Sequence, residues 1–166
     1  PPHLSSAASD VYKRQGLMGV VANSALSGGA SVTGIITEKL DEVEVGHKGL
    51  TRLEVVSTMH ERKSRMAELS DAVISLPGGV GTWEEFFEAL AWNQLGIYSK
   101  PIALFNVDDY YSELYEFTKY SVKEGFLPKS TFEEFFLSDS LDNIFDFILS
   151  FRKRDTKDWF KRLDRK

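Results

Sequence analysis

The chain has 166 residues, enough for one domain with a core of ordinary size. Apolar residues make up 42% and charged residues 27%, as is typical of globular proteins, and the net charge of −5 argues against a broad nucleic-acid surface, which needs clustered Lys and Arg. There is no cysteine, and the histidines (His3, His47 and His60) lack metal-ligand spacing, so we expect neither disulfides nor a metal site.

The distribution of apolar residues bears on location. No apolar run approaches the roughly 18 residues that a membrane-spanning helix needs. The first residues also lack the apolar segment of a signal peptide. We therefore expect a cytoplasmic protein without membrane or nucleic-acid partners.

Residues 1–15 differ from the rest of the sequence. They are rich in Ser, Ala and Pro and show neither a helical nor a strand period. We interpret them as a disordered or foreign leader, although an ordinary flexible N-terminus fits the composition equally well. We expect one domain over residues 16–152 and a basic tail, predicted to be helical, over residues 153–166.

Between these ends, apolar periodicity and the positions of Gly and Pro predict alternating helices and short strands. The predicted helices cover residues 16–27, 59–70, 82–95, 109–124 and 141–151. The predicted strands cover residues 30–37, 53–57, 72–76, 101–105 and 135–137, with a loop over 38–52. This alternation predicts an α/β fold, a doubly wound parallel sheet with helices on both faces.

The segment from Ser75 to Glu85, SLPGGVGTWEE, is the most informative one. A buried strand ends there, and three glycines (Gly78, Gly79 and Gly81) precede a helix. Glycine lets a ligand approach the backbone closely, and the N-terminus of a helix favours anions. Because ligands of open α/β sheets bind at the carboxyl ends of strands, we predict a phosphate site. A tight turn without a ligand is the alternative, but it would need fewer glycines.

The same segment gives Glu85 two possible roles. Thr82 and Glu85 have the T-x-x-E spacing of a capping box, in which the glutamate reaches back to the start of the helix. A carboxylate facing the cleft is equally compatible with the sequence.

The predicted helix 59–70 places a charge in an apolar stripe. Met59, Arg62, Met66 and Leu69 share one helical face. A buried arginine needs a partner, and a substrate or Glu85 would serve. The alternative is an arginine that extends its charged end to solvent. Lys63 lies at the edge of this face, where a surface lysine and a ligand contact are equally compatible with the pattern.

Four motifs, in this order and spacing, resemble the LOG family, the cytokinin-activating phosphoribohydrolases once described as lysine decarboxylases. They are GLMG (Gly16 to Gly19), MHxRKxxM (Met59 to Met66), PGGxGTxxE (Pro77 to Glu85) and QLGIYSKPIALFNVDDYY (Gln94 to Tyr111). The resemblance covers residues 16–149. It implies a Rossmann-like fold and a protein that is usually dimeric and needs no cofactor.

The resemblance also implies an activity and a site. LOG-like proteins hydrolyse the N-glycosidic bond of AMP or of N6-prenylated AMP, giving the free base and ribose 5-phosphate. By this resemblance, Arg62 and Glu85 are the catalytic pair. The implied substrate-binding residues, for phosphate and ribose, are Gly78, Gly79, Gly81, Thr82, Lys63 and Met59.

The sequence departs from the family before Gly16. LOG-like chains normally carry strands and a glycine-rich segment there, whereas residues 11–15 read VYKRQ. We expect missing N-terminal strands, impaired activity and exposed apolar surface. The competing function is a non-catalytic nucleotide or molybdenum-cofactor carrier, which shares a PGGxGT-like loop. The MHxRK motif together with Glu85 favours the hydrolase, and no lysine context typical of a pyridoxal-phosphate decarboxylase is recognisable.

Overall fold

The computed structural model describes residues 4–7, 16–41 and 49–152, and for residues 4–7 only the backbone. The strands are β1 (Leu4–Ala7), β2 (Thr33–Thr37), β3 (Arg52–Val56), β4 (Ala72–Ser75), β5 (Ile102–Phe105) and β6 (Phe135–Ser138). The helices are α1 (Gly16–Ser27), α2 (Glu38–Asp41), α3 (Met59–Leu69), α4 (Val80–Leu95), α5 (Ser112–Lys123), α6 (Lys129–Phe132) and α7 (Leu141–Ser150), with a short 3-10 turn η1 (Val107–Asp109).

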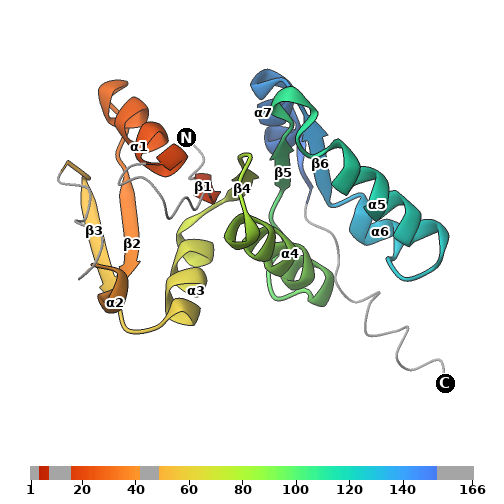
Figure 1. Ribbon diagram of the computed structural model, residues 1–166, viewed down its shortest axis with the longest axis horizontal. Helices are drawn as coiled ribbons and strands as arrows, with labels where there is room; N and C mark the ends of the chain where they lie inside the picture. Colours follow the sequence, from red (N-terminus) through yellow and green to blue (C-terminus); the bar gives the residue numbers. More distant parts are fainter. Residues whose placement is uncertain (1–3, 8–15, 42–48, 153–166) are drawn as a thin grey trace.

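The strands form two sheets in which every pair is parallel. Four strands have the order β1-β4-β5-β6, and β2 pairs with β3 in a separate two-stranded sheet on the β1 side (Figure 1). The predicted α/β class, with parallel strands flanked by helices, is confirmed. The structure adds that β2 and β3 do not join the larger sheet.

Neighbouring side chains of a strand point to opposite faces of the larger sheet, and helices cover both faces. One face packs on α4 and the start of α5, and the other packs on α7. The first cluster contains Phe86, Leu90, Ile102, Leu104, Tyr111 and Phe135. The second contains Ala72, Ile74, Ala103, Ile144 and Ile148. The continuous apolar strands predicted from the sequence are explained by this two-sided burial.

The N-terminal segment differs from its prediction. Leu4–Ala7 forms β1, which pairs in parallel with β4 in the register Leu4 to Ala72 through Ala7 to Ser75. The expectation of a leader without regular structure is therefore wrong for these four residues. The remainder of the predicted leader, residues 1–3 and 8–15, and the predicted helical tail, residues 153–166, lie outside the described residues.

Of the two alternatives for Glu85, the capping box with Thr82 is not found in the structure. Helix α4 begins at Val80, two residues earlier than predicted, and its N-cap is Gly79, which has no side chain to cap with. A capping box occurs instead at α3, where the Thr58 hydroxyl accepts a hydrogen bond from the Glu61 amide and Glu61 accepts one from the Thr58 amide. The Glu85 carboxylate therefore has no role at the start of its helix.

Two further differences concern short elements. The helix predicted over residues 109–124 is divided into η1 and α5, because Asp108 and Asp109 adopt the left-handed conformation with φ of 49° and 58°. The helices α2 and α6 were not predicted, since four residues are too few to establish a helical period.

The two sides of the molecule differ in how well apolar residues are covered. All buried apolar side chains of the described residues belong to positions 72–148. Helix α1 has no buried residue, and its Leu17 and Val20 are exposed, as are Leu53 and Val55 of β3. Exposed apolar side chains are thus found on α1 and β3, but also elsewhere, as at Phe117, Phe126 and Leu149.

Candidate active site

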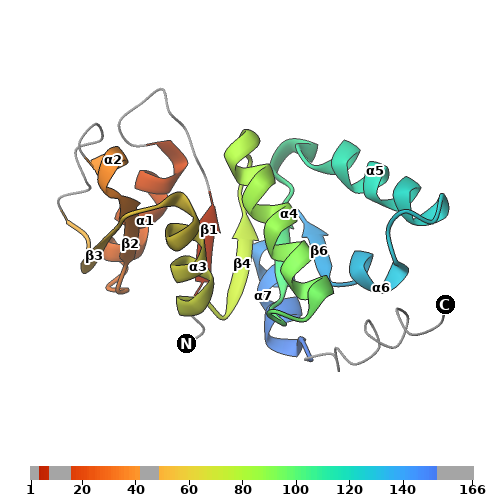
Figure 2. The same cartoon turned by 90° about the horizontal axis from the view of Figure 1, so that it is seen from below.

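Helices α3 and α4 flank β1 and β4 and run side by side (Figure 2). Each begins after the carboxyl end of a strand, α3 after β3 and α4 after β4. This arrangement brings the MHxRK segment next to the glycine-rich loop. The candidate site is the region between the first turns of these two helices.

The glycine-rich loop presents free backbone amides at the start of α4. The first hydrogen bond of the helix runs from the Trp83 amide to the Gly79 carbonyl at 3.1 Å, so the amides of Val80, Gly81 and Thr82 have no partner within the helix. The positive end of the dipole of this 16-residue helix lies at the same place. The loop therefore offers several donors and a favourable potential to an anion.

Gly78 and Thr82 fit against each other at this loop. A Cβ atom added at Gly78 would collide with the Thr82 side chain, whereas one added at Gly79 would meet nothing within 4 Å. Thr82 is only 1% exposed, and its Oγ1 atom has no hydrogen-bond partner among the residues that the structure describes. Buried hydroxyl groups nearly always have a partner, so this one is an exception among the described side chains.

Arg62 and Glu85, which the sequence predicts as the catalytic pair, lie together. The Arg62 NH1 atom is 3.5 Å from Glu85 Oε1, and the two side chains are only 13% and 18% exposed. Arg62 Nε donates a hydrogen bond of 3.0 Å to the Ile35 carbonyl of β2, which fixes the guanidinium. Met59 is exposed, and its sulfur lies 3.5 Å from Arg62 NH1.

The charge of Glu85 is balanced between burial and its neighbours. Burial is the largest influence and raises the pKa of the carboxyl group, while the Arg62 guanidinium lowers it. Glu84 and Glu88 raise it further, and Lys63 lowers it. The net result is a pKa above the usual range, with Arg62 the main group that keeps the carboxylate ionised.

Lys63 is engaged by two carboxylates of α4. Its ammonium group lies 2.5 Å from Glu84 Oε1 and 2.9 Å from Glu88 Oε1. Burial acts to lower the pKa of Lys63, but these two hydrogen bonds outweigh it and raise the pKa. Lys63 therefore ties α3 to α4 beside the catalytic pair. Its predicted contact with substrate stays a prediction, as do the roles of the other site residues.

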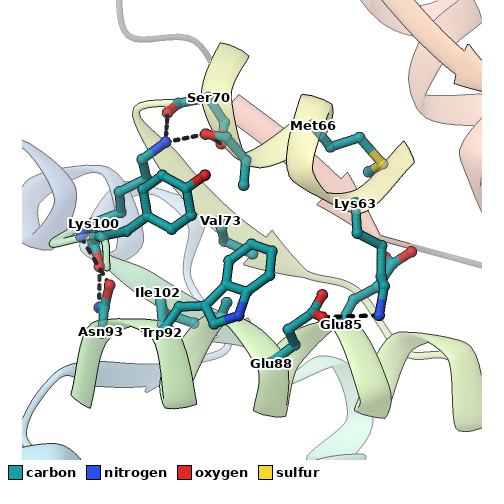
Figure 3. A pocket seen from close by; sticks show the side chains of 13 residues that line it. Lys63, Met66, Ser70, Val73, Glu85, Glu88, Trp92, Asn93, Lys100 and Ile102 are labelled. Atoms are coloured by element: carbon teal, nitrogen blue, oxygen red, sulfur yellow. Dashed lines mark hydrogen bonds and ion pairs between the residues drawn. The ribbon is translucent and has the colours of Figure 1, made fainter. Parts of the chain in front are cut away.

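A pocket between α3 and α4 is lined by Glu85 but not by Arg62. Lys63, Glu85 and Glu88 lie at one end, and the aromatic side chain of Trp92 lies farther along (Figure 3). Asn93 and Lys100 line the opposite end, where they are hydrogen-bonded to each other through the Lys100 backbone. The middle is largely apolar and includes Met66, Ala67, Val73, Ala89 and Ile102.

Two residues at the site, Tyr110 and Tyr111, were missed as functional residues. The Tyr110 hydroxyl donates to the Gly78 carbonyl at 2.7 Å, and the Tyr111 hydroxyl donates to the Leu76 carbonyl at 2.5 Å. The sequence analysis assigned neither of them a role at the site. Their position directly after a buried strand, at the same sheet edge as the glycine loop, is the signal that could have identified them.

Two kinds of feature are not found in the described part of the chain. No group of three or more His, Asp or Glu side chains among residues 16–41 and 49–152 is placed to hold a metal ion. No helix among the described elements is long and apolar enough to cross a membrane.

Comparisons with known proteins identify the family. The family model described as "Possible lysine decarboxylase" matches residues 18–148. A cytokinin riboside 5′-monophosphate phosphoribohydrolase of Rhodococcoides fascians is 50% identical over 119 residues, which is 71% of this chain and 60% of that protein. One of Arabidopsis thaliana is 45% identical over 112 residues, 68% of this chain and 53% of that protein.

A probable enzyme of the same name from Oryza sativa subsp. japonica is 46% identical over 112 residues, 68% of this chain and 50% of that protein. The chain thus spans between 50% and 60% of the length of these relatives. The matched residues 18–148 include α3, α4 and the glycine-rich loop. Together the family model and these relatives show that the chain belongs to the LOG family.

Proposed function

We propose that the chain hydrolyses the N-glycosidic bond of a nucleoside 5′-monophosphate, AMP or N6-prenylated AMP, to the free base and ribose 5-phosphate. The observation that carries the proposal is the largely buried Arg62–Glu85 pair, at 3.5 Å, beside an anion-binding helix start. The names of the relatives, phosphoribohydrolases of cytokinin riboside 5′-monophosphates, support the same bond and the same class of substrate.

The glycine-rich loop binds the 5′-phosphate in this proposal. The amides of Gly79, Gly81 and Thr82 and the partnerless Thr82 hydroxyl donate to phosphate oxygens, while Gly78 leaves the space that this hydroxyl occupies. The energy of binding the phosphate, which does not react, holds the sugar at the catalytic pair.

Glu85 acts at the anomeric carbon. Breaking the bond between ribose and base develops positive charge on the sugar, and a nearby carboxylate stabilises that charge and orients the attacking water. Water supplies the hydroxyl group of ribose 5-phosphate, and its proton leaves with the base. Arg62 keeps Glu85 ionised and aligned, since burial would otherwise favour the protonated carboxyl. Met59 and Lys63 contact the substrate at the edge of the site.

The proposal is tested with three substrates. The chain is incubated with AMP, isopentenyl-AMP and adenosine, and the released base is measured by chromatography. We expect base from the two monophosphates and far less from adenosine, because adenosine lacks the phosphate that the α4 amides bind. Equal cleavage of adenosine and AMP, or no release of base from any of the three, would reject the proposal.

We further propose a cytoplasmic homodimer. The exposed Leu17 and Val20 of α1 and Val55 of β3 support association, because exposed apolar side chains favour contact with another protein. Light scattering coupled to size-exclusion chromatography would give twice the chain mass if this is correct. A monomer at all concentrations would reject it.

A further inference from the structure

We propose that Tyr110 is a positioning residue, which holds the glycine-rich loop in the conformation that binds phosphate. The inference rests on the proposed function, since it concerns the same site. Two neighbouring tyrosine hydroxyls, of Tyr110 and Tyr111, hold the carbonyls of Gly78 and Leu76, on either side of Pro77. The loop is thus held at two points from a segment more than 30 residues away in the sequence, as the separations of 32 and 35 show.

The Tyr110 hydrogen bond fixes the orientation of an amide of the loop. A peptide unit is planar and trans, so its C=O and N–H groups point in opposite directions. Because Tyr110 holds the Gly78 carbonyl at 2.7 Å, the amide of Gly79 in the same peptide unit points away from the tyrosine. This amide immediately precedes helix α4 and belongs to the proposed phosphate site.

The glycine-rich loop needs contacts from outside itself to hold one conformation, because its own residues restrict the backbone little. Glycine has more backbone freedom than any other residue, and Gly78 and Gly79 are adjacent. The N-cap of α4, Gly79, has no side chain that could anchor the first turn. Without the tyrosine the peptide between Gly78 and Gly79 can rotate, and the amides would no longer converge on one phosphate.

The segment that carries the tyrosines is itself held firmly. Asn106 is buried, accepts a hydrogen bond of 2.7 Å from the Tyr111 amide, and donates one of 3.1 Å to the Ser112 hydroxyl. Asp108 and Asp109 have left-handed φ angles of 49° and 58°, a conformation uncommon outside glycine and tolerated best by Asn and Asp. This turn directs both tyrosines towards the glycine loop, so an unfavourable backbone conformation is retained where it serves the site.

The environment of Tyr110 separates a positioning role from a role in stability. Tyr110 is 47% exposed, so its hydroxyl could form a hydrogen bond with water instead, and burial does not force the contact with Gly78. Its ring packs edge to face on Tyr111, with centroids 4.9 Å apart, and this packing survives removal of the hydroxyl. Tyr111 is buried, so removing its hydroxyl would also leave the Leu76 carbonyl without this partner.

The test is Tyr110→Phe in the full chain, which removes only the hydroxyl. We measure KM and kcat for AMP, the inhibition constant of inorganic phosphate, and the thermal unfolding midpoint. We expect KM and the inhibition constant to rise roughly three- to tenfold, the range for one lost hydrogen bond, with kcat and the midpoint close to those of the unsubstituted chain. Tyr120→Phe, at an exposed tyrosine of α5, is the matched control and should change none of them.

The outcomes distinguish the two proposals. If the unsubstituted chain cleaves AMP and Tyr110→Phe leaves KM and phosphate inhibition unchanged, the positioning role is overturned and the hydrolase stands. A fall in kcat at constant KM would likewise overturn it, since that pattern indicates a role at the reacting carbon or a loss of folded protein. If the unsubstituted chain neither cleaves AMP nor binds phosphate, both proposals fail.

Discussion

Removing Arg62 should destabilise the protein in a way that depends on pH. The substitution Arg62→Met keeps a long apolar stem and removes the cation that lies 3.5 Å from the Glu85 carboxylate. Both side chains are largely shielded from water, so the remaining carboxylate would be a nearly buried charge without its main partner. The pKa of Glu85, already raised by burial, would rise further.

The magnitude is limited by protonation of Glu85. At 3.5 Å and an effective dielectric constant of about 20, Coulomb attraction amounts to roughly 4–5 kcal/mol. The carboxyl group can instead take up a proton, which at pH 7 costs about 3 kcal/mol relative to an unfolded pKa of 4.5. Protonation of Glu85 costs less than the lost attraction, so it sets the upper limit of the effect. We expect a pH-dependent loss of about 1–3 kcal/mol in the free energy of unfolding at pH 7.

The sign follows from proton binding. A folded-state pKa above the unfolded value means that the folded protein holds the proton more tightly, so stability falls as pH rises from 4.5 towards the folded pKa. Below the unfolded pKa both states are protonated and this difference disappears. The loss caused by Arg62→Met should therefore be largest at neutral pH and small near pH 4, apart from a constant part of about 1 kcal/mol for the lost hydrogen bond to Ile35.

The assay is urea unfolding followed by circular dichroism at pH 7 and at pH 4. Arg65→Met is the comparison on the same helix; its side chain is 34% exposed, and it should cost less at pH 7. An equal loss for Arg62→Met at both pH values would refute the reasoning, because it would mean that Glu85 does not depend on Arg62 for its charge.

Two further predictions concern the glycine-rich loop. Thr82→Val removes a buried hydroxyl that has no partner in the described part of the chain, so thermal stability should stay the same or rise. Inorganic phosphate should inhibit AMP cleavage roughly three- to tenfold less strongly, and unchanged inhibition would show that the hydroxyl does not reach the phosphate. Gly78→Ala should lower the unfolding midpoint because the new Cβ collides with Thr82, whereas Gly79→Ala meets open space; a larger loss for Gly79→Ala in thermal unfolding would contradict this packing.

The features predicted best from the sequence are those that depend on a short run of neighbouring residues. The glycines after Leu76 and the two-sided apolar strands located α4 and the larger sheet, because each follows from a short run of residues. The position of Arg62 within an apolar stripe also suggested a buried partner, and the structure places Glu85 there. Here a charged residue on an otherwise apolar helix face indicated the site.

The remaining features depend on contacts that local patterns do not contain. The segment Leu4–Ala7 has no strand period, and it becomes a strand by pairing with β4. The start of α4 was placed two residues late, because its N-cap, Gly79, has no capping side chain that would mark the position in the sequence. The bond from Tyr110 to Gly78 joins positions 32 residues apart and follows only from the order of the strands.

The most direct test of the account is Glu85→Gln, with AMP turnover and AMP binding measured on the same preparation. The substitution removes the charge and keeps the shape, so we expect the release of adenine to be abolished while AMP still binds through the glycine-rich loop. Glu113→Gln, at an exposed position of α5, should retain full turnover. Adenine release by Glu85→Gln at the rate of the unsubstituted chain would contradict the central claim that this carboxylate acts at the anomeric carbon.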